Sequence, residues 1–139
     1  MVPCVRAVDT VDQAFAAVQE EDPTRTVVVE GGEAGCQDGG GNTRIREYRD
    51  RHVWIEATGP GTLVLADSWY PGWTAQVDGA AAEILKADVV YRAVTLGPGP
   101  HTITFDYDPG LPARLLPFSA LIALGAGASL LFRRRAPPA

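Results

Sequence analysis

The chain has 139 residues, a hydrophobic fraction of 46% and a formal net charge of −5, which suits one domain and little more. All 17 acidic residues precede residue 109 and four of the 12 basic residues follow residue 113, so residues 1–113 carry a formal charge of about −9. Because phosphates require a basic surface, this acidic body argues against a nucleic-acid partner.

The first predicted element is a short helix after residues 1–8, which show no clear pattern. Thr10 and Gln13 have the spacing of a capping box. Apolar residues follow at helical intervals, namely Val11, Ala14, Phe15 and Val18. The helix should end by Glu21, because Pro23 disfavours helical backbone at the residue before it.

Short β-branched or alternating segments, separated by turn signals, make up most of residues 24–107. We expect strands at 26–30, 43–50, 52–58, 62–68, 73–77, 81–85, 89–96 and 101–107. Residues 31–42 hold six glycines and should form a mobile loop; no Gly-Lys-Ser/Thr follows, so a phosphate-binding loop is disfavoured. The spacing predicts a mainly β domain at residues 1–110, an antiparallel, jelly-roll-like β-sandwich with a short N-terminal α-helix.

Residues 66–79 form an aromatic corner, with two of the three tryptophans and two turn signals. Pro71-Gly72 suits a type II turn, and Asp78-Gly79 suits a type I′ hairpin turn. Between the turns, apolar and polar residues alternate, as in a half-buried strand. The stretch therefore predicts a strand, a corner, a second strand and a hairpin.

An uncharged run of 18 residues, Leu115–Phe132, precedes three consecutive arginines. As a helix it would extend about 27 Å, close to the thickness of a bilayer core. We predict a C-terminal transmembrane helix at 111–132, with residues 1–110 outside and the basic tail 133–139 in the cytoplasm. The alternative is a buried C-terminal helix of a soluble domain. No N-terminal signal is visible, so we expect the tail of a longer protein.

Five segments together resemble the C-terminal end of the YfhO-like bacterial membrane proteins: residues 63–73, 77–79, 91–94, 99–103 and 105–109. The resemblance implies a fragment of a multi-pass protein of the bacterial cell membrane, related to lipid-linked-sugar glycosyltransferases and linked with cell-envelope glycosylation. It also implies an upstream transmembrane core as partner, and it supplies no catalytic residue. Trp69 stands where that family often has Tyr.

The aromatic corner is the best candidate for a ligand site, because flat rings stack on sugars and polar side chains accept hydroxyl hydrogens. Six residues are candidates for contact with a glycan or lipid-linked sugar: Trp69, Tyr70, Trp73, Asp67, Gln76 and Asp78. The alternative, which the turn residues favour, is that the corner is packing and turn alone, with Trp73 in the core. Trp69 and Tyr70 could also lie at a membrane interface.

Other chemistry is disfavoured. Asp67 and Asp78 could be read as a glycosidase pair, but nothing in the sequence sets their distance. Cys4 and Cys36 suit an oxidising exterior and their pairing stays open; with two histidines they show no zinc spacing. The sequence predicts no catalytic residue, no cofactor and no metal site.

We therefore expect a non-catalytic extracytoplasmic C-terminal domain, with the last membrane helix, of a YfhO-like protein. The alternative is a stand-alone, membrane-anchored carbohydrate-binding or protein-interaction module. Small residues around Gly125 and Gly127 would let the membrane helix pack against another helix, which we expect to belong to the upstream core.

Overall fold

The computed structural model describes residues 1–37 and 41–110. The predicted transmembrane helix at 111–132 and the tail at 133–139 lie outside the described residues. Within the described ranges, no helix is long and apolar enough to cross a membrane. The chain divides into two units, Met1–Asp108 and Pro109–Ala139, and the fold below is that of the first.

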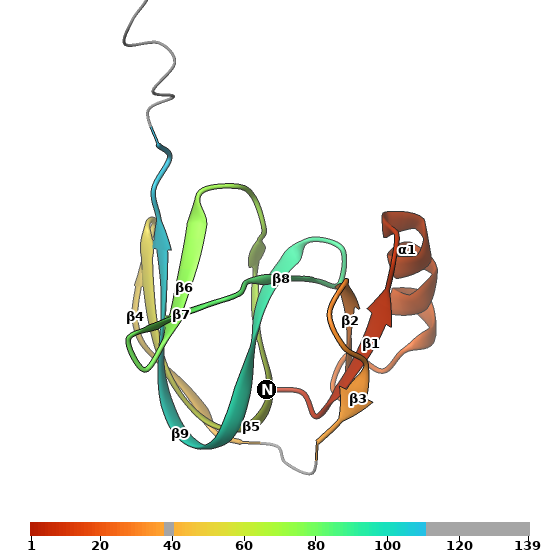
Figure 1. Ribbon diagram of the computed structural model, residues 1–139, viewed down its shortest axis with the longest axis horizontal. Helices are drawn as coiled ribbons and strands as arrows, with labels where there is room; N and C mark the ends of the chain where they lie inside the picture. The colour runs from red at the N-terminus through yellow and green to blue at the C-terminus, as the bar shows by residue number, and fades with distance from the viewer. Residues whose placement is uncertain (38–40, 111–139) are drawn as a thin grey trace, which may run out of the picture. The chain divides into compact units, whose positions relative to one another are not determined.

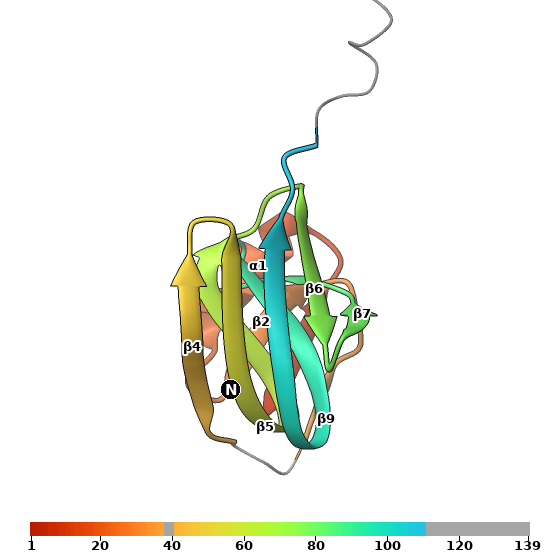
Figure 2. The ribbon, with the colours of Figure 1, turned by 90° about the vertical axis from the view of Figure 1, so that its left-hand side faces the viewer.

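The described residues form a mainly β structure with one short helix and one mixed sheet. The elements are β1 (Cys4–Val8), α1 (Val11–Glu20), β2 (Thr26–Glu30), β3 (Gly35–Cys36), β4 (Thr43–Arg49), β5 (His52–Ser68), β6 (Trp73–Val77), β7 (Ala80–Ala82), β8 (Leu85–Ala87) and β9 (Tyr91–Tyr107). The sheet order is β3-β1-β2-β8-β9-β5-β4, and β6 pairs with β9 and β7 (Figures 1 and 2).

Two long strands, β5 and β9, run antiparallel and bend together, so that one sheet forms two layers (Figure 1). The prediction of separate strands on either side of Gly59-Pro60-Gly61 was wrong, because β5 runs through this segment. Likewise β9 runs through the predicted turn at 97–100. A Cβ at Gly59 would overlap the carbonyl oxygen of Gly97, so glycine lets the two backbones stay paired at the bend.

The main core lies between the two layers and takes side chains from both halves of β5 and β9. Its largest members are Val53, Ile55, Leu63, Leu65, Val94, Leu96, Ile103 and Phe105. The predicted alternation in 52–58, 73–77 and 101–107 is confirmed, because the apolar set of each segment faces this core. Figure 2 shows β4, β5, β9 and β6 side by side in one of the layers.

The sheet is mixed, which corrects the purely antiparallel prediction. β1 pairs with β2 in parallel, with Cys4 opposite Thr26 and Val8 opposite Glu30, and α1 forms the crossover between them. Strand β1 was not predicted, because all five of its residues are half-buried and neither of its faces is clearly apolar.

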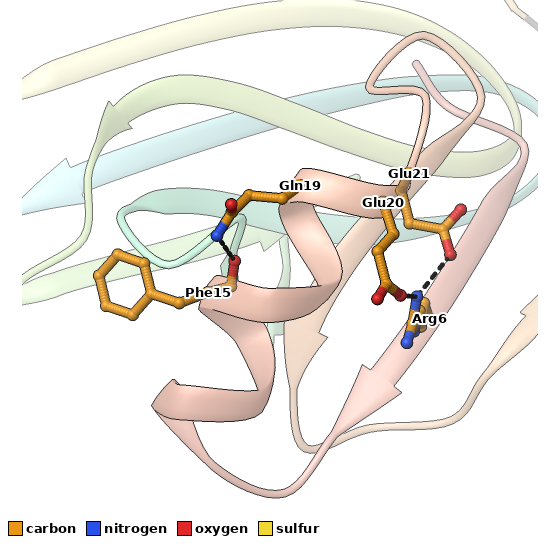
Figure 3. A network of polar contacts seen from close by, with 5 residues as sticks. All are labelled: Arg6, Phe15, Gln19, Glu20 and Glu21. Carbon is orange, nitrogen blue, oxygen red and sulfur yellow. Dashed lines mark hydrogen bonds and ion pairs between the residues drawn. The ribbon is translucent and has the colours of Figure 1, made fainter.

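The predicted helix is confirmed as α1, with Thr10 as its N-cap accepting from the backbone N–H of Gln13. Its contact face is made of Ala14 and Ala17, which pack on Val28, whereas Phe15 is exposed. Figure 3 shows how β1 holds the end of the helix: Arg6 Nη1 donates to Glu20 at 3.0 Å and to Glu21 at 2.9 Å.

A disulfide joins Cys4 to Cys36, which settles the pairing that the sequence left open. The two cysteines lie opposite each other in the antiparallel pair of β1 and β3. Part of the predicted loop 31–42 is therefore strand β3, bonded to the edge of the sheet; residues 38–40 lie outside the described part.

Candidate functional site

The aromatic corner connects β5 to β6 and both of its predicted turns form. Gly72 has φ 107°, as the third position of a type II turn requires, and Asp78 and Gly79 have φ 53° and 80°, as a type I′ turn requires. A Cβ on Gly72 would lie 2.6 Å from a ring carbon of Tyr107. The corner is thus packed directly against the end of β9.

A buried arginine, Arg92 on β9, lies behind this corner with only 2% of its side chain exposed. Its Nη2 donates to Asp67 Oδ2 at 2.9 Å. The guanidinium carbon stacks 3.6 Å above the ring centroid of Trp73 and lies 5.6 Å from that of Phe105. The corner therefore holds a charge in the core, between a carboxylate and an indole ring.

Three aromatic rings pack edge-on or tilted beside the arginine. The centroid of Tyr70 lies 6.1 Å from that of Trp73 and 5.2 Å from that of Tyr107, and Trp73 lies 5.3 Å from Tyr107. Such pairs favour these geometries, since the edge of one ring meets the face of another. The cluster is only partly covered, because Tyr70 is 42% exposed.

A hollow of about 290 Å³ opens beside this cluster. Its lining includes Tyr48, Asp50, Asp67, Tyr70, Trp73 and Arg92. Tyr48, from β4, donates its hydroxyl to Asp67 Oδ2 at 2.6 Å. The carboxylate of Asp67 is therefore shared between a phenol on the surface and a guanidinium in the core.

Burial lowers the pKa of Arg92, against the neighbouring Asp67 carboxylate, which raises it. The hydrogen bond to Asp67 raises the pKa of the Tyr48 hydroxyl above its usual value. Among the described residues, Arg92 Nε, Arg92 Nη1 and Trp73 Nε1 have no hydrogen-bond partner, although all three are buried. The cluster therefore holds more buried N–H donors than acceptors. Each buried donor without an acceptor destabilises the fold by roughly 1–3 kcal/mol.

The structure brings together only some of the six sequence-predicted residues. Asp67, Tyr70 and Trp73 meet at the hollow. Gln76 lies exposed further along β6 and pairs with Thr104. Asp78 lies five residues beyond Trp73, roughly 16 Å along the strand. The structure therefore brings three of the six together and separates Gln76 and Asp78 from them.

Trp69, the sixth of these residues, is 39% exposed on the surface of the corner. Its backbone N–H donates to the carbonyl of Val90 at 2.6 Å, which ties the corner to the turn before β9. Its indole is not part of the hollow's lining. A role for this ring would therefore lie outside the hollow.

Asp78 instead forms a second polar cluster at the β6–β7 hairpin. Its Oδ2 lies 2.7 Å from His101 Nδ1, and its Oδ1 accepts the backbone N–H of Thr102 at 2.8 Å. The contact with Asp78 raises the pKa of His101, and the carbonyl of Gly97 adds to this. The N–H of Thr102 and then His101 lower the pKa of Asp78. These contacts show that Asp78 stabilises the β6–β7 hairpin and does not line the hollow.

Sequence reasoning missed two residues that complete the hollow, Arg92 and Tyr48. A signal for Arg92 was present, because it is a single charge inside the apolar run 89–94. A charged residue at a core position requires a partner. No pattern in residues 43–50 distinguished Tyr48 from an ordinary edge-strand residue.

A larger hollow, of about 550 Å³, lies between β4, β5 and β9, and its lining includes Arg44, Arg46, Thr58 and His101. Its lining includes no Phe, Tyr or Trp side chain, and two of its charged groups pair with each other, Arg46 with Glu56 at 2.6 Å. The hollow at Tyr70 is the better candidate because it combines phenol and indole rings with a carboxylate.

Within residues 1–37 and 41–110, no group of three or more His, Cys, Asp or Glu side chains could hold a metal ion. Comparisons of the chain with protein-family models, with curated proteins and with solved structures find no match. Any functional argument therefore depends on the residues themselves.

Proposed function

We propose that residues 1–110 are a non-catalytic extracytoplasmic domain that contacts glycan through the hollow at Tyr48, Tyr70 and Trp73. The single observation that carries this is the hollow itself, in which partly exposed rings adjoin a carboxylate; the unpaired N–H donors belong to two residues of its lining, Arg92 and Trp73, and are themselves buried. Sugars present C–H faces to rings and hydroxyls to polar groups. We also propose that the two layers of the sheet form a jelly-roll-like sandwich.

We place this domain at the end of a YfhO-like multi-pass membrane protein of bacterial cell-envelope glycosylation, anchored by a helix at 111–132. The sequence resemblance of residues 63–73, 77–79, 91–94, 99–103 and 105–109 to the end of that family supports this proposal. The uncharged run 115–132, followed by three arginines, supports the anchor.

The test is a glycan array probed with the full chain in lipid nanodiscs, comparing wild type with Tyr70→Ala. The matched control is Trp54→Ala, because Trp54 is an aromatic residue of similar exposure that does not line the hollow. We expect Tyr70→Ala to lose binding and Trp54→Ala to keep it, with both proteins β-rich by circular dichroism. Absence of binding by folded wild type would refute the glycan contact.

A stand-alone interaction module is the second candidate, and an exposed apolar stripe on α1 favours it. Val11, Phe15 and Val18 lie at helical spacing and are 40%, 57% and 37% exposed. Genomic context separates the candidates. An in-frame upstream reading frame with many transmembrane helices would support the membrane-protein domain, whereas an isolated gene with its own promoter would support the module.

A further inference from the structure

The hollow has an excess of donors, and this predicts the chemistry of its ligand. Three N–H-bearing atoms in two stacked groups lack an acceptor: Nε and Nη1 of Arg92 and Nε1 of Trp73. Asp67, the carboxylate that pairs with Arg92 in the described part of the chain, is shared with Tyr48. A group that is rich in acceptor oxygens and carries negative charge would complete this arrangement.

We propose that the hollow binds an oxyanion carried on a sugar, either a carboxylate or a phosphate, through the N–H groups of Arg92 and Trp73. This inference rests on the proposed glycan contact. An arginine favours such a group because its planar fork matches the paired oxygens of a carboxylate or phosphate. The rings of Tyr48 and Tyr70 are then available to the sugar.

The donors are buried, so a ligand that reaches them must displace a side chain at the mouth of the hollow. Tyr70 lines the hollow, is 42% exposed and belongs to the short connection between β5 and β6, where its ring packs against Trp73 and Tyr107. Asp67 also lines the hollow, and 30% of its side chain is exposed. An entering oxyanion would compete with Asp67 for Arg92.

The experiment follows the indole N–H resonances of the full-length ¹⁵N-labelled chain in detergent micelles, with Trp73 assigned from Trp73→Phe. The titrants are D-glucuronate, D-glucose 6-phosphate, D-glucose, acetate and inorganic phosphate. We expect the acidic sugars to shift the Trp73 signal with an affinity at least about tenfold above that of glucose. Whichever acidic sugar binds more tightly identifies carboxylate or phosphate as the group.

Asp67→Asn is the decisive variant, because it removes the competing charge while keeping the side-chain size. We expect it to tighten binding of the acidic sugars by about threefold or more and to leave glucose unchanged. A purely structural role of Asp67 would not tighten binding. If Asp67→Asn does not fold, Arg92→Lys takes its place: it keeps the charge without the fork, and unchanged affinity for acidic sugars would contradict the inference.

The outcomes separate the two proposals. Equal affinity for glucuronate, glucose 6-phosphate and glucose would overturn the oxyanion inference and leave the glycan contact standing. Acetate and phosphate binding as tightly as the acidic sugars would support an oxyanion site and refute the contact with sugar. No shift of Trp73 with any titrant would refute both.

Discussion

Two aspartates form ion pairs with residues of the same strand, β9, but in opposite surroundings. Asp67 pairs with Arg92 at 2.9 Å, and that guanidinium is 2% exposed. Asp78 pairs with His101 at 2.7 Å, and both of those side chains are more accessible, at 51% and 16%. The pairs have similar distances but differ in two respects. Arg92 is buried and stays charged, whereas His101 is more accessible and is charged only when protonated.

The difference shows that burial decides what an ion pair can do in this domain. Water competes for the Asp78–His101 pair and satisfies the groups left over, so the pair can only fix a hairpin. Arg92 has little water to satisfy its remaining donors, so its surroundings must supply acceptors or leave a cost. The Asp78–His101 contact therefore stabilises the hairpin after β6. At the other end of β6, the Asp67–Arg92 contact leaves N–H donors of the arginine without an acceptor.

The largest expected effect comes from Asp67→Asn, which removes the charge that compensates a buried cation. We expect the free energy of unfolding to fall by about 2–3 kcal/mol. Asp78→Asn is the matched change at the exposed pair, and asparagine tolerates its positive φ, so a clearly smaller loss is expected there. Urea denaturation of the full chain, followed by circular dichroism, measures both; equal losses would remove the distinction between the pairs.

A smaller effect is expected from Tyr48→Phe, which removes the 2.6 Å hydrogen bond to Asp67. Because Tyr48 is exposed, we expect a loss of about 1 kcal/mol or less. Spectrophotometric titration gives a second readout: wild type should contain one tyrosine that ionises above the usual pKa of 10, which the variant lacks. Tyr91→Phe is the control, and should leave that late titration in place.

The exposed pair, Asp78 and His101, should make the thermal stability of the domain depend on pH. The pKa of His101 is raised in the folded protein, so its stabilisation is complete below the usual pKa of 6.5 and is lost as the pH rises through the folded value. The pKa of Asp78 is lowered, so its stabilisation is present above 3.8 and is lost on acidification through the folded value. Thermal melts between pH 4 and pH 9 should show wild type falling above about pH 6.5.

Asp78→Asn is the control for that profile, because it keeps the turn and removes the carboxylate beside His101. Its decline above about pH 6.5 should be weaker than that of wild type. Parallel profiles for the two proteins would show that the pair makes no contribution to stability.

The smallest net effect is expected where both buried charges are replaced together, in Asp67→Leu with Arg92→Met. Replacing a buried ion pair by apolar residues of similar size is often neutral or stabilising, so we expect stability within about 1 kcal/mol of wild type. The acidic-sugar response should disappear at the same time. A loss as large as that of Asp67→Asn would mean that the pair itself stabilises the fold.

Local patterns were sufficient to predict the parts of the fold that depend on neighbouring residues. The cap at Thr10, the turns at Gly72 and Asp78, and the alternation around Ile103 all follow from a few adjacent side chains. The strand at residues 4–8 was not predicted, because each of its residues is half-buried and a strand without an apolar face shows no periodicity in the sequence. The prediction of a turn at Gly59 was wrong, because glycine and proline occur both in turns and in bent strands.

The site was predicted only where the chain itself brings residues together. Tyr70 and Trp73 are neighbours in one corner, so their sequence carried the information. Arg92 comes to Asp67 through the pairing of β5 with β9, with Leu65 opposite Arg92 in the register. Tyr48 reaches the same carboxylate from β4. Such contacts depend on sheet topology, which one sequence does not specify.

The central place of β9 also sets the order in which the domain can be assembled. β5, β6 and β8 all pair with β9, which is the last strand within residues 1–37 and 41–110, and His52 pairs with Asp106 across 54 residues. Contacts this distant in sequence form late, because a long loop must close before they are made. During synthesis, β5, β6 and β8 are therefore made before the strand with which they pair. The hollow is completed only when Arg92 has arrived.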